Sequence, residues 1–324
     1  MKRRQLLLAA AGSTLYQTAS AKTSWKLASG YKIDSFQGKN LAEFAKDAEA
    51  ATGGSLGIEL LPNNSFVPMG EIPGAVLDGR LQAGEVIMTG LVKDMPVAGA
   101  DSVPFVVSSY EDAQRLWKHQ RPVLERHFER RGLQVLYAVP WPPQCLYSTK
   151  PITKAEDLQG THMRTYNATT VRIAEMLGAK PVDVPMSEVG RALAEGRMDN
   201  MITSATTGVD NKVWDSFKFF YEINAWYPKN LVFVSRKAMD ALSPAERKAL
   251  LEAASRAESR GWETSQVVAR ESVNELRRHG MKVEPAPALL SPQIRRLGER
   301  FSLEWIREIG REANEIFIPF YVKP

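Results

Sequence analysis

The chain has 324 residues, of which 44% are hydrophobic and 24% are charged, and its formal net charge at pH 7 is +5. This balance is ordinary for a soluble globular protein, and the length is sufficient for about two domains. Because Lys2, Arg3 and Arg4 carry three of the positive charges and no basic run is interleaved with aromatics, the composition argues against a nucleic-acid-binding protein.

The first 21 residues have the pattern of an export signal. Basic residues at 2–4 precede a short apolar run at 6–11, and Ala19-Ser20-Ala21 offers a small-x-small cleavage site. The apolar run is too short to span a membrane, so cleavage after Ala21 and a periplasmic location are predicted. The pair Arg3-Arg4 is compatible with both the twin-arginine route and the ordinary export route.

The region from 25 to 140 alternates between strand and helix patterns. Such alternation predicts an α/β fold with helices on both faces of a parallel or mixed sheet. The predicted strands are 25–33, 56–61, 85–91 and 133–140, and the predicted helices are 40–52, 69–78 and 109–131, the last with a bend expected at Pro122.

Prolines at 140, 142 and 143 mark the expected exit from a first domain. A second α/β unit follows at about 146–228, and the apolar run 231–234 is expected to return to the first sheet. The single cysteine, Cys145, cannot form an internal disulfide and is expected to be a small buried hydrophobe.

Within the second unit, residues 160–208 begin with a strand, a helix and a short strand. Residues 161–166 favour a strand, Asn167 or Thr169 can cap a helix, and Gly178 can end it. Arg164 then stands near the carboxyl end of its strand, where anions are favoured. Two interpretations are open: a surface salt bridge, or a guanidinium that holds a ligand carboxylate by two hydrogen bonds.

The C-terminal third is mostly helical. Helical patterning from 244 to 279 is interrupted only at Gly261, which leaves either one long helix or a pair broken at that glycine. Residues 289–316 supply one or two further helices, and a proline-broken end is expected at 317–322.

Motifs of catalysis and cofactor binding are missing from the sequence. The four histidines are scattered without metal-ligand spacing, and there is no phosphate-binding loop, dinucleotide fingerprint or nucleophile elbow. No enzyme activity, cofactor or metal site is therefore expected.

Several segments, taken in order, resemble the solute-binding subunits of tripartite ATP-independent periplasmic (TRAP) transporters, the DctP-type family. The resemblance covers nearly the whole chain after residue 21, and its specificity comes from the order of the pieces. They are TGGSL (52–56), DSVPF (101–105), KPI (150–152), DLQG (157–160), MRTYN (163–167), LGA (177–179), VPMSEV (184–189), ALAEGRMD (192–199) and LSP (242–244).

The resemblance implies a two-lobe periplasmic binding protein of the type II-like, Venus-flytrap kind, with a long helix that spans both lobes. On this basis lobe I is expected to comprise 22–142 and 230–268, and lobe II 143–229 and 269–324. The implied partners are a small organic acid and the membrane permease subunits of the transporter, and the chain itself is expected to be a monomer.

The resemblance also implies a binding site centred on Arg164, which would hold the carboxylate. Thr203 stands where the family often has an asparagine, and Gln144 stands where relatives place a second arginine. One arginine instead of two favours a monocarboxylate, or a 2-oxo or 2-hydroxy acid, over a dicarboxylate. A cation held between Gln144, Glu222 and a 2-oxo acid is an alternative.

Other residues are expected to complete the site on both lobes. Glu85 could accept a ligand hydroxyl or amine, or could instead pair with Lys39 or Arg80. Aromatic walls would suit an aromatic or branched acyl chain, although core packing is an alternative for each ring. The predicted wall residues are Trp141, Trp226, Tyr166, Phe36, Met88 and Met186.

The predicted function is capture of a small organic acid by hinge closure, followed by delivery to a membrane permease. The alternatives are a binding protein that reports its ligand to a membrane receptor and, less favoured, an exported enzyme. An enzyme would alter its ligand chemically, whereas a binding protein would release it unchanged.

Overall fold

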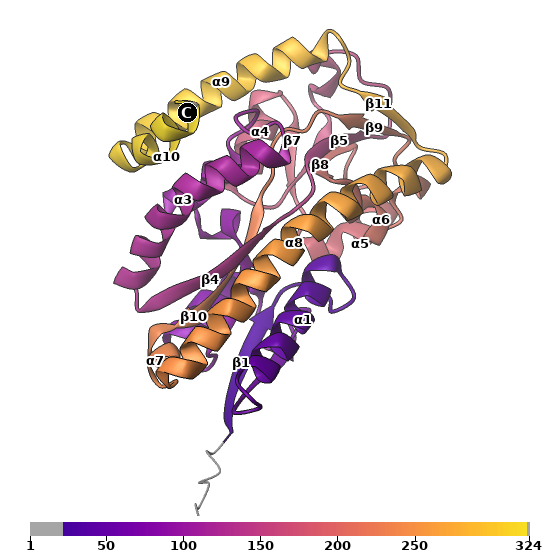
Figure 1. Cartoon of the computed structure of the whole chain (residues 1–324). Coiled ribbons are helices and arrows are strands. Elements are labelled where there is room, and N and C mark those ends of the chain that lie inside the picture. The colour runs from indigo at the N-terminus through magenta and orange to yellow at the C-terminus, as the bar shows by residue number, and fades with distance from the viewer. Residues whose placement is uncertain (1–21, 323–324) are drawn as a thin grey trace, which may run out of the picture.

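A computed structural model describes residues 22–322 of the chain. The predicted export signal at 1–21 lies outside the described residues. Two separate β-sheets form the centre of the structure, and helices surround them (Figure 1). No helix within residues 22–322 combines the length and apolarity needed to cross a bilayer.

The first sheet has five strands in the order β2-β1-β3-β10-β4. Strand β1 is parallel to β2 and β3, whereas β10 is antiparallel to β3 and β4, so the predicted mixed sheet is confirmed. The strands are β1 (Thr23–Ser29), β2 (Leu56–Leu61), β3 (Ala83–Ile87), β4 (Leu133–Pro140) and β10 (Lys229–Ser235).

Two strand predictions in this sheet are too long, because β1 ends at Ser29 instead of residue 33 and β3 also ends early. Strand β3 ends at Ile87, and residues Met88–Leu91 form the 3₁₀ turn η2 instead of the end of a strand. Gly90 lies in that turn, and glycine is typical of positions where a strand gives way to a turn.

The second sheet has six strands in the order β11-β9-β5-β8-β6-β7. Strand β6 is parallel to β7 and β8, and β5 is antiparallel to β8 and β9. The strands are β5 (Gln144–Ser148), β6 (His162–Thr165), β7 (Lys180–Asp183), β8 (Asn200–Ser204), β9 (Phe219–Glu222) and β11 (Lys282–Pro285).

Most of the predicted helices are present, and their caps explain where they begin. Asn167, one of the two predicted caps, accepts a hydrogen bond from the backbone N–H of Thr170 at the start of α4. The helices before residue 241 are α1 (Phe36–Ala51), α2 (Ile72–Leu77), α3 (Tyr110–Arg130), α4 (Ala168–Met176), α5 (Val189–Ala194), α6 (Ala205–Asp210) and α7 (Arg236–Asp240).

Two short crossovers join the sheets and are hydrogen-bonded to each other. The first leads from β4 to β5, and the second leads from β9 to β10. The N–H of Trp141 donates to the carbonyl of Pro228 at 2.7 Å, and the N–H of Gln144 donates to the carbonyl of Trp226 at 3.0 Å. The two connections therefore form one ladder-like strip between the sheets.

Helix α8 (Pro244–Arg278) is a single helix of 35 residues, so the alternative of a pair broken at Gly261 is wrong. A capping box between Ser243 and Glu246 begins it. Gly261 is needed for close packing, because a Cβ there would lie 2.4 Å from Val139 of β4. Helix α8 contacts α1 and β4 at one end and α6 and β11 at the other (Figure 1).

The C-terminal tail forms helices α9 (Leu290–Ile309) and α10 (Arg311–Tyr321). The proline-broken end expected at 317–322 is wrong, because α10 continues through Pro319 with Phe317 and Phe320 buried beneath it. Helix α10 packs on α3, and this contact brings the end of the chain back beside the first sheet. The division of the chain into the two predicted lobes stays a prediction.

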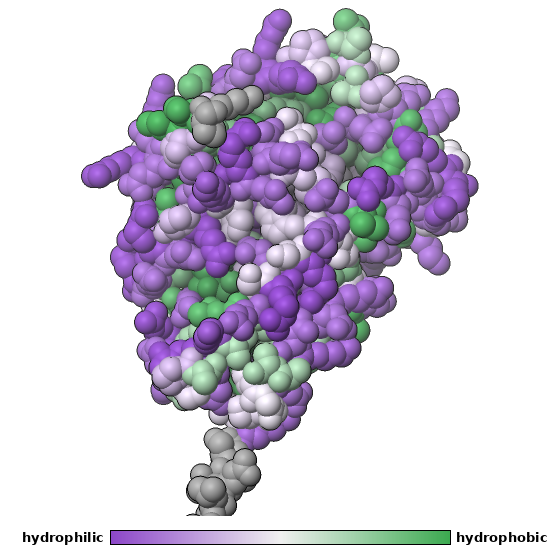
Figure 2. Space-filling view, in the orientation of Figure 1, coloured by the Kyte–Doolittle hydropathy of each residue, from purple (hydrophilic) through white to green (hydrophobic). Residues whose placement is uncertain are grey.

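The surface is largely hydrophilic on the face that α8 crosses, where apolar side chains appear in small separate groups (Figure 2). Scattered apolar residues of this kind are normal for a soluble protein.

Candidate functional site

A cavity of about 470 Å³ lies where the carboxyl ends of strands from both sheets face each other. Its size is within the range of pockets for small ligands, roughly 300–1,000 Å³. The ends of β1 and β3 and the loop after β2 supply one wall, and the ends of β6 and β8 supply the opposite wall. Ligands of open α/β sheets commonly bind at such strand ends.

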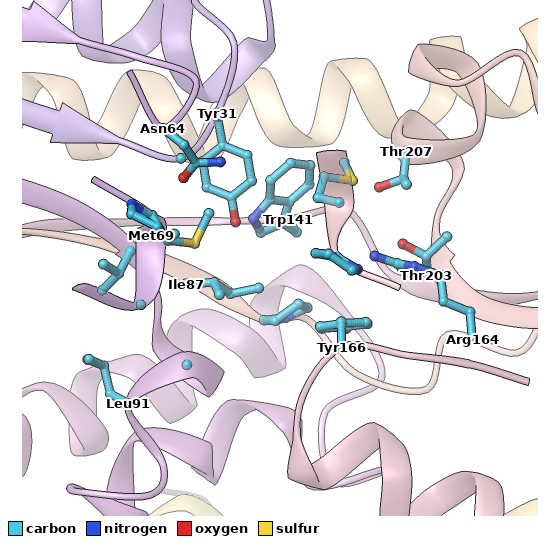
Figure 3. A pocket seen from close by; sticks show the side chains of 18 of the residues that line it. Tyr31, Asn64, Met69, Ile87, Leu91, Trp141, Arg164, Tyr166, Thr203 and Thr207 are labelled. Carbon is cyan, nitrogen blue, oxygen red and sulfur yellow. The ribbon is translucent and has the colours of Figure 1, made fainter. Parts of the chain in front are cut away.

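Arg164 lies at the end of β6 and is only 5% exposed. Its Nε donates to the carbonyl of Val184 at 2.9 Å, and its guanidinium carbon lies 4.8 Å from the centre of the Tyr166 ring. Figure 3 shows the guanidinium pointing toward the middle of the cavity. No carboxylate of residues 22–322 lies within 4.0 Å of it, so its two terminal nitrogens have no anionic partner in this part of the chain.

Burial without a carboxylate makes the charge of Arg164 costly. Desolvation lowers the pKa of the guanidinium to about 10, which corresponds to roughly 3 kcal/mol against the charged form. The group is still charged at neutral pH. A bound carboxylate would offset this cost with charge-assisted hydrogen bonds.

The two walls of the cavity differ in polarity (Figure 3). Thr203 at the end of β8 and Thr207 of α6 lie on the same side as Arg164. The opposite side is mostly apolar, with Met69, Ile87 and Leu91 among its lining residues. The arrangement therefore suits a ligand with an anionic end and a compact apolar part.

The structure brings six of the ten predicted site residues together around this cavity. They come from the first crossover, from strands of the second sheet and from the turns that follow β6 and β7, and their joint presence depends on the order β5-β8-β6. The six are Trp141, Gln144, Arg164, Tyr166, Met186 and Thr203.

The other four predicted residues are buried behind the cavity lining. Trp226 is 1% exposed and is among the largest fully buried side chains of the described residues. Phe36 packs edge-on against the outer side of Trp141, with ring centres 5.0 Å apart. Met88 is fully buried in the core, because η2 turns it away from the strand direction.

Glu85 supports the site from behind instead of lining it. Its carboxylate accepts hydrogen bonds from Ser29 Oγ at 2.5 Å and from Asn230 Nδ2 at 2.9 Å. Asn230 Oδ1 in turn accepts from the indole N–H of Trp141 at 2.8 Å. Burial raises the pKa of Glu85, and neither of the suggested partners, Lys39 and Arg80, contacts it.

This network leads to a stability prediction for Glu85→Gln. A glutamine would accept from Asn230 through its single oxygen and turn its NH₂ group toward Ser29, whose hydroxyl would then accept instead of donate and lose the acceptor of its own buried O–H. We expect the free energy of unfolding to fall by about 1–3 kcal/mol in urea denaturation. Glu59→Gln on the exposed edge of β2 is the matched control and should stay within about 0.5 kcal/mol of wild type. An equally small effect of Glu85→Gln would contradict the supporting role.

Several lining residues are absent from the sequence-based prediction. They lie at or after the carboxyl ends of strands, where an open α/β fold places its ligand. That signal was missed because the predicted strands 25–33 and 85–91 extend past the observed strand ends. These residues include Tyr31, Asn64, Met69, Ile87 and Leu91, with Thr207 after β8. The Tyr31 ring lies against Trp141, with centres 5.2 Å apart.

The alternative of a cation held between Gln144 and Glu222 finds no support in the geometry. Gln144 lines the main cavity, whereas Glu222 lines a separate one on the side of α8 and lies 3.7 Å from Arg277. Among residues 22–322 no three acidic, histidine or cysteine side chains cluster as metal ligands. The buried Cys145 in that second cavity has its pKa raised to about 12 by desolvation.

Comparisons with known proteins place the chain among bacterial solute receptors. The model of the bacterial extracellular solute-binding proteins, family 7 (DctP), matches residues 28–297. The C4-dicarboxylate-binding periplasmic protein DctP of Rhodobacter capsulatus is 26% identical over 228 residues, which are 68% of this chain and 67% of that protein.

Two solved structures from Bordetella pertussis are more similar. Both are extracytoplasmic solute receptors that bind pyroglutamic acid, and both are 34% identical to this chain. DctP6 superposes with a TM-score of 0.91 over 93% of this chain and 100% of its own, and DctP7 with 0.90 over 92% and 99%. The predicted two-lobe α/β fold is confirmed by these likenesses.

Proposed function

The chain belongs to the DctP family of bacterial extracellular solute-binding proteins, family 7, and from this membership we propose that it captures a small monocarboxylate through Arg164 for a TRAP transporter. The observation that carries the proposal is the buried guanidinium of Arg164, which faces a cavity and has no carboxylate partner among residues 22–322. Arginine binds a carboxylate through two parallel hydrogen bonds, which are stronger in a desolvated cleft than at a surface.

The charges of the cavity support a ligand with one carboxylate. Arg164 is the single ionisable side chain, apart from tyrosines, among the described lining residues. A second carboxylate would have no cation to meet and would lie near apolar side chains such as Ile87 and Leu91. Pyroglutamic acid, the ligand named for both Bordetella receptors, has one carboxylate and a compact ring, so we take it as the first candidate.

Closure of two lobes around the acid is part of the proposal. We assign 22–142 and 230–268 to lobe I and 143–229 and 269–324 to lobe II, with α10 of lobe II lying on α3 of lobe I. The hydrogen-bonded crossovers and α8 are the elements that connect both sheets, so hinge motion would occur there. We further propose export through the signal at 1–21, a monomeric state and transfer of the ligand to membrane permease subunits.

A thermal-shift screen of the protein without residues 1–21 tests this function. A ligand that binds only the folded state raises the melting temperature by mass action. We expect clear shifts with pyroglutamate or other compact monocarboxylates, and recovery of the acid chemically unchanged after incubation. Shifts limited to sugars, amines or metal ions would refute the assignment, and conversion of the acid would favour an enzyme.

A further inference from the structure

The side-chain amide of Gln144 has a fixed orientation in the cavity wall. Gln144 is 3% exposed, and one end of its amide lies 2.8 Å from the carbonyl oxygen of Pro142. A proline carbonyl can only accept, so the atom facing it must be the amide nitrogen, Nε2. The oxygen, Oε1, has no donor among residues 22–322 and is not sealed from the cavity.

The backbone at Gln144 is held in place by hydrogen bonds, and the Pro142 carbonyl prevents the side-chain amide from turning over. Its N–H donates to the carbonyl of Trp226 at 3.0 Å, and its carbonyl accepts from the N–H of Ala225 at 2.8 Å. A flipped amide would place Oε1 against the oxygen of Pro142 and leave both without a donor, which is costly in a buried site. Oε1 of Gln144 is therefore a fixed acceptor on the cavity wall, available to the ligand.

The other polar groups of the lining are less selective. The hydroxyls of Tyr31, Tyr166 and Thr203 can donate or accept, and the amide of Asn64 lies on an exposed rim where it can reorient. Trp141 can only donate, and Asn230 already takes its indole N–H, so Gln144 Oε1 and the Arg164 guanidinium are the fixed groups of the described lining that a ligand can use. Their strands, β5 and β6, are two strand spacings apart, roughly 10 Å at the backbone, so one small acid can reach both.

We propose that Gln144 selects acids that carry a hydrogen-bond donor, N–H or O–H, in addition to the carboxylate held by Arg164. The inference rests on the proposed function and narrows its ligand class to hydroxy acids and acids with an amide N–H, such as lactams. An acid of the same shape with an acceptor at that position would oppose one oxygen to another in a desolvated site and be rejected.

Two matched pairs of acids test the selection by isothermal titration calorimetry. Pyroglutamate has a ring N–H, and 5-oxotetrahydrofuran-2-carboxylate replaces it with a ring oxygen. In the second pair, 2-hydroxy-3-methylbutanoate has an O–H donor where 2-oxo-3-methylbutanoate has a carbonyl oxygen that can only accept. For the pair that binds, we expect the donor acid to bind wild type at least about tenfold more tightly than its partner.

Gln144→Met has a similar length and no amide, so it should reduce the ratio of the two affinities to within about threefold. Gln114→Met on the exposed face of α3 is the control and should leave both affinities as in wild type. Thermal unfolding checks that each variant is folded. The ratio of the two affinities measured with wild type alone already tests the selection.

The outcomes separate this inference from the function on which it rests. Equal binding of both members of a pair, tighter binding of the acceptor acid, or an unchanged ratio in Gln144→Met would overturn the role of Gln144 and leave the monocarboxylate assignment standing. Failure of all four acids to bind wild type would overturn the assigned ligand class, and the selection with it.

Discussion

Arg164→Ala is expected to weaken binding of pyroglutamate, or of whichever monocarboxylate binds wild type, by roughly 30-fold to several thousand-fold. The range corresponds to about 2–5 kcal/mol, the cost of removing one partner of a buried, hydrogen-bonded charge pair. The empty variant should be at least as stable as wild type, because the desolvated guanidinium with its lowered pKa is gone.

Calorimetry measures the change in affinity, and thermal unfolding of the ligand-free protein measures the change in stability. Arg164→Lys keeps the charge and loses the planar fork, so it should bind with intermediate affinity. The control is Arg80→Ala, since Arg80 pairs with Asp78 on the surface and should leave affinity unchanged. Binding by Arg164→Ala at wild-type strength would remove the central assignment, and a large loss of stability would mean that Arg164 is structural.

Asp101→Ala is expected to lower the free energy of unfolding by about 3–5 kcal/mol. Asp101 Oδ2 lies 3.4 Å from Lys229 Nζ, and both side chains are fully buried. The same oxygen accepts the backbone N–H of Lys229 at 2.8 Å. Desolvation raises the pKa of Asp101 and lowers that of Lys229, so removal of one charge would leave the other buried and uncompensated.

Urea unfolding of a double-mutant cycle checks this expectation. Asp101→Ala combined with Lys229→Met removes both charges and should recover most of the loss, because apolar replacement of a buried pair is often neutral. Additive losses in the double variant would show that the two side chains act independently. The pair fixes Lys229, next to the lining residue Pro228, so it also holds the second crossover in place.

The parts of the structure predicted correctly from the sequence are those specified by local signals. The unit β6-α4-β7 follows from strand-forming residues, the cap at Asn167 and the stop at Gly178, and it positions Arg164 without reference to the rest of the chain. The long helix α8 follows from continuous patterning.

The incorrect predictions concern residues whose role depends on how deeply the side chain is buried and on where a strand ends. Glu85 and Val86 are neighbours in β3, yet Val86 lines the cavity and Glu85 bonds to Ser29 beneath it, because alternate residues of a strand face opposite sides. Met88 was assigned to the wall on the premise that the strand continues, and the turn at η2 removes that premise. No pattern in the sequence indicates the partners of such residues.

The buried thiol of Cys145 has a practical consequence for experiments on the protein. With a pKa of about 12, only about one molecule in 10⁵ carries a thiolate at neutral pH, and the thiolate is the form that oxidants and maleimides attack. A cysteine introduced on the exposed face of α1 and another on that of α5 should therefore be labelled without interference from the natural one. Energy transfer between two such dyes would report directly on the distance between the lobes as the ligand is added.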